Sequence, residues 1–269
     1  MSQRSSHRLS QRLSQGLTHR LIGMVHLGPL PGAPRFRGHL QEVIDAAVGD
    51  AMTLGDAGFD ALMVENLGDA PFFPDEVPQI TVAAMTRAVD AIGAVGLPTG
   101  VNVLRNDALA ALSIAAITAA SFIRVNVLTG TMFTDQGPIV GRAAEVERFR
   151  SLHCPDVAIV ADVFVKHATP PAGLTLEEAT HDLSTRSGAD GIIVSGPATG
   201  AAADLDDLAL VADTKSLPVF VGSGVTAASI GATLKIADGV IVGSATKPDG
   251  NVDAPVDADL ARAIVAAAG

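Results

Sequence analysis

The sequence has no tryptophan, no tyrosine and a single cysteine, Cys154. One cysteine excludes an intrachain disulfide and any metal site built from several cysteines, and it is typical of proteins in a reducing compartment. We therefore expect a cytoplasmic protein. With nine phenylalanines as the only aromatic residues, the chain also has few rings on which nucleic-acid bases could stack.

Positive charge is scarce as well. Lysine and arginine together number 18, against 29 aspartate and glutamate residues, which gives a formal net charge of −11. Because an acidic surface repels nucleic-acid phosphates and anionic lipids, we expect neither nucleic acid nor a membrane surface as a partner. The longest apolar stretch without a charge, Ala108–Ile123, is shorter than the about 20 residues that a membrane-spanning helix needs. The sequence therefore predicts no membrane insertion.

The first 20 residues differ from the rest of the chain. They contain four arginines and no acidic residue, and leucine recurs at every fourth position from Leu9 to Leu17. Such a composition is compatible with a transit peptide, but a basic disordered tail is the simpler interpretation and the one we prefer. The predicted organisation is a tail over residues 1–20 and one domain over residues 21–269.

From Leu21 onward, short apolar runs alternate with segments of helical composition. The apolar runs are residues 22–26, 61–65, 99–103, 122–126, 157–162, 191–195, 219–222 and 240–243. The helical segments are residues 40–57, 78–94, 107–119, 141–151, 175–187, 204–215, 226–235 and 257–268. Alternating strands and helices form parallel sheets, and hydrophobic content of 48% over 269 residues supplies a large core. Eight such units predict a single (β/α)8 TIM barrel.

An internal repeat supports this prediction. Residues 57–64, 187–194 and 236–242 share one form, in which a helix ends, a small residue and an aspartate follow, and an apolar run begins. The aspartates Asp60, Asp190 and Asp238 then lie at the starts of strands, at the bottom of a barrel. We interpret them as structural residues of the turns.

The connections after the predicted strands are long, over residues 27–39, 66–77, 127–141 and 163–174. Long loops on one face indicate a functional face, which in a barrel is the end where the strands terminate. The first of these loops contains Pro29, Pro31 and Pro34 and is expected to form a stiff pocket wall. The loop 127–141 has glycines near both ends and is interpreted either as a lid or as an ordinary surface loop.

Two glycine turns late in the chain favour an anion site. Gly222, Ser223 and Gly224 follow one strand and open into a predicted helix, and Gly243 and Ser244 follow the next strand. Glycine lets backbone N–H groups approach a ligand, a helix N-terminus adds partial positive charge, and the loops after strands 7 and 8 hold phosphate in many barrels. The alternative is a pair of packing turns.

Polar residues at strand ends are expected to point into the barrel or toward its mouth. They are His26, Glu65, Asn66, Asn102, Arg124, Asn126, Asp162 and Ser195. The alternation of side chains along a strand places Arg124 one layer below Asn126. A buried guanidinium needs a carboxylate partner, and Glu65 and Asp162 are the candidates.

Catalytic roles are predicted for Asp162 with Lys166 and His167 as an acid–base cluster, and for Glu65 and His26. Substrate binding is predicted for Asn102, Arg124, Asn126 and Ser195, with the phosphate on Gly222, Ser223, Gly224, Gly243 and Ser244. A metal on His26, Glu65 and Asp162 has suitable ligand types, but no close ligand spacing supports it, so no metal is predicted. The dinucleotide fingerprint, the P-loop and Gly-x-Ser-x-Gly are absent, so no cofactor and no serine triad are predicted.

Several motifs together resemble the BtpA family. They are residues 22–27 with 29–32, residues 100–107, residues 162–167, residues 194–196 with 198–200, and residues 221–226. The resemblance extends over about residues 21–268. It implies a barrel of the ribulose-phosphate-binding type. The family is named for a role in photosystem I biogenesis in cyanobacteria, and it has members in organisms without photosynthesis and a branch among sugar-metabolism genes. It implies no settled reaction.

Two functions follow as hypotheses. The first is an enzyme, such as a lyase, isomerase or hydrolase, that acts on a phosphorylated small molecule, for instance a sugar phosphate. The second is a non-catalytic factor that assists assembly of a membrane protein complex. Whether copies of the chain associate is left open at this stage.

Overall fold

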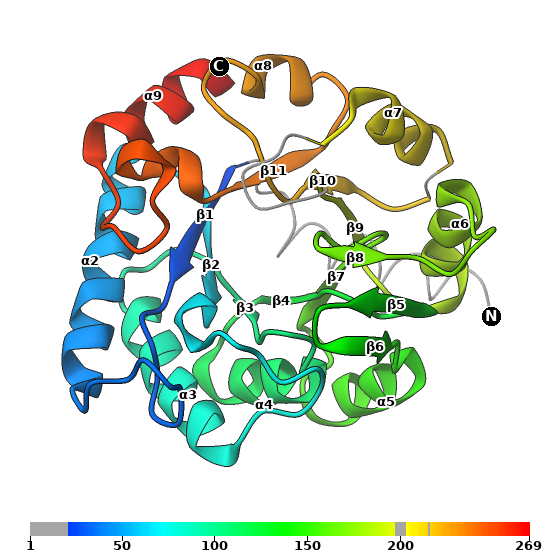
Figure 1. Cartoon of the computed structure of the whole chain (residues 1–269). Helices are drawn as coiled ribbons and strands as arrows, with labels where there is room; N and C mark the ends of the chain where they lie inside the picture. The colour runs from blue at the N-terminus through cyan, green and yellow to red at the C-terminus, as the bar shows by residue number, and fades with distance from the viewer. Residues whose placement is uncertain (1–20, 197–202, 215) are drawn as a thin grey trace.

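The computed structural model describes residues 21–196, 203–214 and 216–269. In these residues, eight parallel strands close into a barrel in the order β1, β2, β3, β4, β7, β9, β10, β11 (Figure 1). The strands are β1 (Leu21–His26), β2 (Ala61–Glu65), β3 (Thr99–Asn102), β4 (Phe122–Val125), β7 (Ala158–Asp162), β9 (Gly191–Val194), β10 (Val219–Val221) and β11 (Gly239–Val242). The predicted TIM barrel is confirmed. The predicted tail and residues 198–200 lie outside the described residues.

Helices surround the barrel in the described part of the chain (Figure 1). They are α2 (Leu40–Ala57), α3 (Gln79–Gly93), α4 (Ala108–Thr118), α5 (Ala143–His153), α6 (Leu176–Arg186), α7 (Leu205–Thr214), α8 (Ile230–Thr233) and α9 (Ala258–Ala268), with short 3-10 turns η1 (Leu67–Asp69), η2 (Ser244–Thr246) and η3 (Pro248–Gly250). None of the helices in the described ranges combines the length and apolarity that crossing a bilayer would require.

One predicted helix is much shorter than expected. The prediction placed it over residues 226–235, immediately after the glycine turn, but α8 begins only at Ile230. Between them the chain makes a turn in which the Thr226 N–H donates to the Ser229 hydroxyl. The expected contribution of a helix N-terminus to an anion at Gly222–Gly224 is therefore wrong, because a single turn of helix lies several residues beyond it.

The barrel interior is filled by side chains that alternate along the strands. Its apolar layer consists of Ile22, Met24, Ala61, Met63, Phe122, Ala158, Val160, Ile193, Phe220 and Ile241, all buried. Gly100 makes room for the Phe122 ring, because a Cβ at Gly100 would lie 2.3 Å from it. Since side chains on one face repeat every second residue, the next inward positions toward the mouth are the polar residues at the strand ends.

The three repeated aspartates are confirmed as structural residues at the bottom of the barrel. Asp60 accepts the backbone N–H of Leu21, Asp190 that of Ile159, and Asp238 that of Val219. Each carboxylate thus binds the start of a neighbouring strand. The repeat therefore fixes the relative position of strands and leaves the opposite end for function.

The loop after β4, predicted as a lid or an ordinary surface loop, contains regular secondary structure. It forms the hairpin β5 (Thr131–Thr134) and β6 (Gly137–Val140), and β5 pairs on its other edge with β8 (Ala168–Thr169) from the loop after β7. Gly130 and Gly137 have positive φ, so the glycines shape the hairpin. The Gly141 N–H closes its base on the Gly130 carbonyl at 2.8 Å. This second sheet lies over the mouth beside β7 and β9 (Figure 1).

Candidate functional site at the barrel mouth

A buried polar layer closes the top of the barrel interior. His26, Glu65 and Asn102 lie at matching positions on the adjacent strands β1, β2 and β3. Arg124 on β4 and Asp162 on β7 complete the layer, and both are buried. The prediction that polar residues late in the strands face the interior is thereby supported by their burial and contacts.

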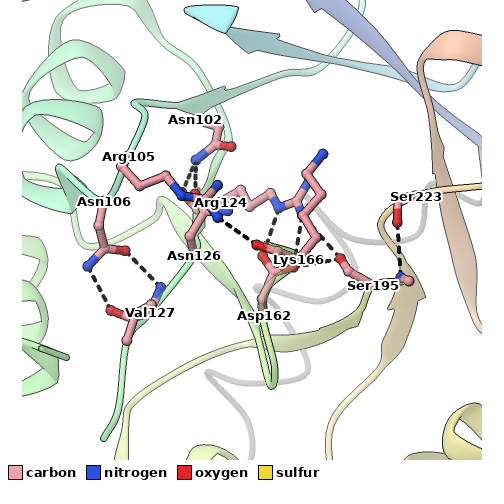
Figure 2. Close-up of polar contacts among 11 residues, drawn as sticks. Asn102, Arg105, Asn106, Arg124, Asn126, Val127, Asp162, Lys166, Ser195 and Ser223 are labelled. Atoms are coloured by element: carbon pink, nitrogen blue, oxygen red, sulfur yellow. Dashed lines mark hydrogen bonds and ion pairs between the residues drawn. The ribbon is translucent and has the colours of Figure 1, made fainter. Parts of the chain in front are cut away.

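Arg124 and Asp162 form a two-point ion pair at the centre of this layer (Figure 2). Arg124 Nε donates to Asp162 Oδ2 at 2.8 Å and Nη2 to Oδ1 at 2.8 Å. The Ser195 hydroxyl donates to the same Oδ1 at 2.7 Å. Burial alone would lower the pKa of Arg124, but the charge and hydrogen bonds of Asp162 outweigh it and raise that pKa. Of the two predicted partners for Arg124, Asp162 is the one bound.

Asn102 supports Arg124 from the other side. Its amide nitrogen donates to the Arg124 carbonyl at 3.1 Å and to Asn126 Oδ1 at 3.0 Å (Figure 2). Asn102 is buried, and its side-chain oxygen has no hydrogen-bond partner in the described structure. Asn102 and Asn126, which were predicted to bind substrate, therefore connect the ends of β3 and β4. The side-chain oxygen of Asn102 is left as an unused acceptor.

Two further asparagines organise the mouth loops. Asn66 accepts the Leu104 N–H at 2.7 Å and donates to Asp69, so it joins the loops after β2 and β3. Asn106 bonds both backbone groups of Val127 (Figure 2), which joins the loops after β3 and β4. Prediction did not single out Asn106, although it lies within the motif 100–107.

Glu65 and His26 are neighbours at the edge of the layer. His26 Nε2 lies 3.9 Å from Glu65 Oε1, and His26 Nδ1 is buried with no hydrogen-bond partner in the described residues. Burial lowers the pKa of His26 to about 4, against the opposing charge of Glu65. The imidazole is therefore neutral at pH 7, and the adjacent carboxylate is not used by the Arg124–Asp162 pair.

The two glycine turns approach this layer closely. A Cβ at Gly222 would lie 2.5 Å from Ile193, 2.8 Å from the Ser195 hydroxyl and 3.1 Å from Arg124 Nη2, and a Cβ at Gly243 would lie 3.0 Å from His26. Only glycine therefore fits at either position without displacement of these neighbours.

The turns also leave donors unused. In the described ranges, the backbone N–H groups of Ser223, Gly224 and Ser244 donate to no carbonyl. The Ser223 hydroxyl accepts the Gly196 N–H at 3.0 Å (Figure 2), which ties the turn to the end of β9. Unpaired N–H groups at the rim of a polar pocket are suited to bind an anion.

One small pocket, with a volume of about 30 Å³, brings these groups together. It is lined by Met24, His26, Glu65, Arg124, Lys166, Gly222, Ser223, Gly224, Gly243, Ser244 and Val252. Both predicted glycine turns therefore border the same space. Asp162, Asn102, Asn126 and Ser195 do not line it, and Asp162 influences it through Arg124.

A larger cavity of about 870 Å³ adjoins the small one. It lies between the loop after β1, helix α2 and the loop before α9, and His26 and Val252 line both spaces. Pro29 and Phe36 form part of its wall, so the predicted role of the first loop as a pocket wall agrees with its position.

Cations gather around the small pocket although the chain is poor in them. Lys166 lines it, and burial together with the charges of Arg124 and Arg105 lowers the pKa of Lys166, against the opposing charges of Glu65 and Asp162. His167 is exposed and does not line the pocket, and its backbone has a positive φ. The catalytic role suggested for His167 thus stays a prediction without support from its position.

Arg105 is the main residue that sequence reasoning missed. It is buried beside the mouth and donates to the Lys166 carbonyl at 2.6 Å, and no carboxylate of the described chain pairs with it within 4 Å. Burial lowers its pKa, although Asp162 and Asp135 oppose this. The available signal was a cation three residues after the end of β3 in a chain with few cations.

His26, Glu65 and Asp162 were considered above as ligands of a metal. Within the described ranges, no group of three or more His, Cys, Asp or Glu side chains could hold a metal ion. Both carboxylate oxygens of Asp162 already accept hydrogen bonds from Arg124 or Ser195.

Comparison with known proteins places this arrangement in context. The chain is 48% identical over 239 residues to the photosystem I biogenesis protein BtpA of Synechocystis, covering 88% of this chain and 83% of that protein. Among solved structures it resembles thiamine phosphate pyrophosphorylase from Pyrococcus furiosus (TM-score 0.58, 13% identity, 94% and 98% of the two chains). It also resembles N-(5'-phosphoribosyl)anthranilate isomerase from the same organism (TM-score 0.56, 16% identity, 93% and 98%).

The two structural similarities show the fold alone, since both identities are low. The sequence model of the BtpA family matches residues 18–269, which include every strand of the barrel and both glycine turns. The chain belongs to the BtpA family.

Proposed function

We propose that this protein binds a phosphorylated small molecule at the mouth of its barrel, with the phosphate held by the turns Gly222–Gly224 and Gly243–Ser244. The observation that carries the proposal is the shared pocket, in which both turns face Arg124 and Lys166. Unpaired backbone N–H groups beside the Arg124 guanidinium favour an anion there. Because the overall charge is −11, such local attraction is needed for an anionic ligand to approach.

The ligand extends beyond its phosphate. The small pocket has room for one end of a molecule, since a volume of about 30 Å³ corresponds to roughly two water-sized spheres. The adjoining cavity of about 870 Å³ shares His26 and Val252 with it. We assign the remainder of the ligand to this side of the mouth.

The residues divide into groups that contact the ligand and groups that position them. Glu65 and His26 line the pocket without strong partners, so they are the candidates for proton transfer. Arg124 orients the ligand. Asp162, predicted as the acid or base, holds Arg124 in a buried two-point pair, a geometry that supports a positioning role. The reaction can be that of a lyase, an isomerase or a hydrolase.

The names of the two structural relatives agree with this proposal, since each name includes a phosphorylated compound. At 13% and 16% identity they transfer no residue roles. The proposal therefore depends on the pocket of this chain.

Thermal unfolding with added ligand tests the proposal. Inorganic phosphate and a panel of phosphorylated metabolites are expected to raise the midpoint, because a ligand bound to the native state stabilises it by mass action. In Gly222→Ala the added methyl group would displace Arg124 and Ser195, so the shift should vanish. Gly93→Ala, at an exposed helical position with nothing within 4 Å, should retain it. An equal shift in both variants would refute a phosphate site at these turns.

A second candidate function rests on the Synechocystis relative, which is named as a photosystem I biogenesis protein. In this alternative the protein assists assembly of a membrane complex without catalysis. Affinity capture from a membrane extract, with full-length protein and a form lacking residues 1–20, is expected to recover membrane subunits if the alternative holds. Capture of none by either form would count against it.

A further inference from the structure

Lys166 differs from the other described lysines in its surroundings. Its side chain rises beside Arg124 (Figure 2) and lines the phosphate pocket, yet in the described structure its amine makes no hydrogen bond or ion pair. By contrast, Lys247 is buried against Asp50 and the Ala254 carbonyl, and Lys235 is exposed. An amine held in a pocket without a partner has its lone pair available for chemistry once it loses a proton.

The environment disfavours the protonated form of this amine. Burial removes water, and the guanidinium groups of Arg124 and Arg105 repel a third positive charge; together they lower the pKa of Lys166, although Glu65 and Asp162 act in the opposite direction. Arg124 is held in place by Asp162, and Arg105 holds the Lys166 backbone through its carbonyl. Desolvation next to another cation is one way in which proteins activate a lysine as a nucleophile.

A proton acceptor lies in the same pocket. Glu65 lines it together with Lys166, and its carboxylate has no hydrogen bond in the described residues beyond the 3.9 Å approach of His26. The phosphate turns line the same pocket. A ligand held by its phosphate would therefore present its next atoms between an amine and a carboxylate.

From this geometry we infer that Lys166 is a nucleophile that condenses with the aldehyde or ketone carbonyl of the phosphorylated ligand. The amine nitrogen bonds to the carbonyl carbon, and its proton passes through Glu65 to the carbonyl oxygen. Loss of water from this carbinolamine then gives an imine, with no net oxidation or reduction. The inference rests on the proposed phosphate site, and it narrows the ligand class to phosphorylated carbonyl compounds.

Trapping with pyridoxal 5'-phosphate and borohydride tests the inference, because that probe carries both an aldehyde and a phosphate. The chain has only four lysines, so peptide mass spectrometry can locate every adduct. We expect Lys166 to be modified faster than Lys235 at pH 7, because the glycine turns hold the phosphate of the probe beside its amine and the lowered pKa of Lys166 leaves more of that amine unprotonated. Lys166→Arg should lose this fast phase, and Lys235→Arg should keep it. Modification of Lys166 no faster than that of Lys235 would overturn the inference.

Two further measurements separate this inference from the phosphate site. Binding of inorganic phosphate, measured by calorimetry, should persist in Lys166→Met if the amine meets the carbonyl. A loss of more than tenfold would mean that the amine is a phosphate ligand, and the nucleophile would be ruled out while the phosphate site stands. Conversely, if pyridoxal without phosphate modifies Lys166 as fast as the phosphorylated probe and inorganic phosphate gives no protection, the phosphate site fails while the reactive amine remains.

Discussion

Removing both partners of the Arg124–Asp162 pair should destabilise the protein by less than the sum of the two single losses. The side chains of Arg124 and Asp162 are 2% and 0% exposed, so Asp162→Asn leaves a buried guanidinium without its counter-charge. Arg124→Met likewise leaves a buried carboxylate with only the Ser195 hydroxyl as donor. Each single change is expected to cost about 3–5 kcal/mol of unfolding free energy.

The double variant removes both charges and should be nearer to wild type than the sum of the two losses, with a coupling energy of about 2–3 kcal/mol. Urea unfolding followed by far-ultraviolet circular dichroism is the suitable assay, because the chain has no tryptophan or tyrosine for fluorescence. The exposed pair Arg262 and Asp259 serves as a matched control, and its cycle should give less than about 1 kcal/mol. Additive losses at Arg124 and Asp162 would refute the view that they act as one unit.

Three other perturbations follow from the same contacts. His26→Gln should reduce the loss of stability between pH 6.5 and 4, because burial holds the pKa of His26 at about 4, below the model-peptide value of 6.5. Wild type then loses on the order of 3 kcal/mol over that window as the unfolded state takes up the proton, and identical urea midpoints against pH for both proteins would contradict this. Asn66→Ala should cost about 1–3 kcal/mol and speed hydrogen exchange at Leu104, whose N–H loses its acceptor; unchanged exchange would exclude Asn66 as the link between the two loops. Gly243→Ala should displace His26 and weaken phosphate protection in thermal unfolding, with Gly93→Ala as the control; full protection would show that the second turn does not contact the ligand.

Much of the fold could be predicted because the barrel is periodic. The strand β2 was predicted at its observed bounds, Ala61–Glu65, and the others within two residues, since strands buried on both faces read as continuous apolar runs. The second sheet was missed because β5 and β6 have four residues each and β6 contains Pro138, and such short segments resemble a loop. Helix α8 was overestimated because its start depends on a local turn at Thr226 and Ser229.

The site was predictable only in part, for a related reason. Period-two alternation placed Arg124 correctly beneath the mouth, and a buried guanidinium required a carboxylate, which Asp162 supplies. Alternation could not show that Asp162 would be bound to Arg124 and absent from the pocket lining, because that depends on which side chains extend to the pocket. Arg105 and Lys166 lie on loops, and the hydrogen bond between them depends on tertiary contacts for which the sequence has no period.

The pairing of β5 with β8 makes the position of the Lys166 amine depend on the β5–β6 hairpin. One residue separates Lys166 from β8, whose Ala168 and Thr169 pair with Thr134 and Phe133. Lengthening or shortening the hairpin would therefore move Lys166. Arg124, Asp162 and the glycine turns would keep their positions, because they belong to the barrel strands and the turns that follow them. The distance between Lys166 and the glycine turns would then change without a change in any strand of the barrel.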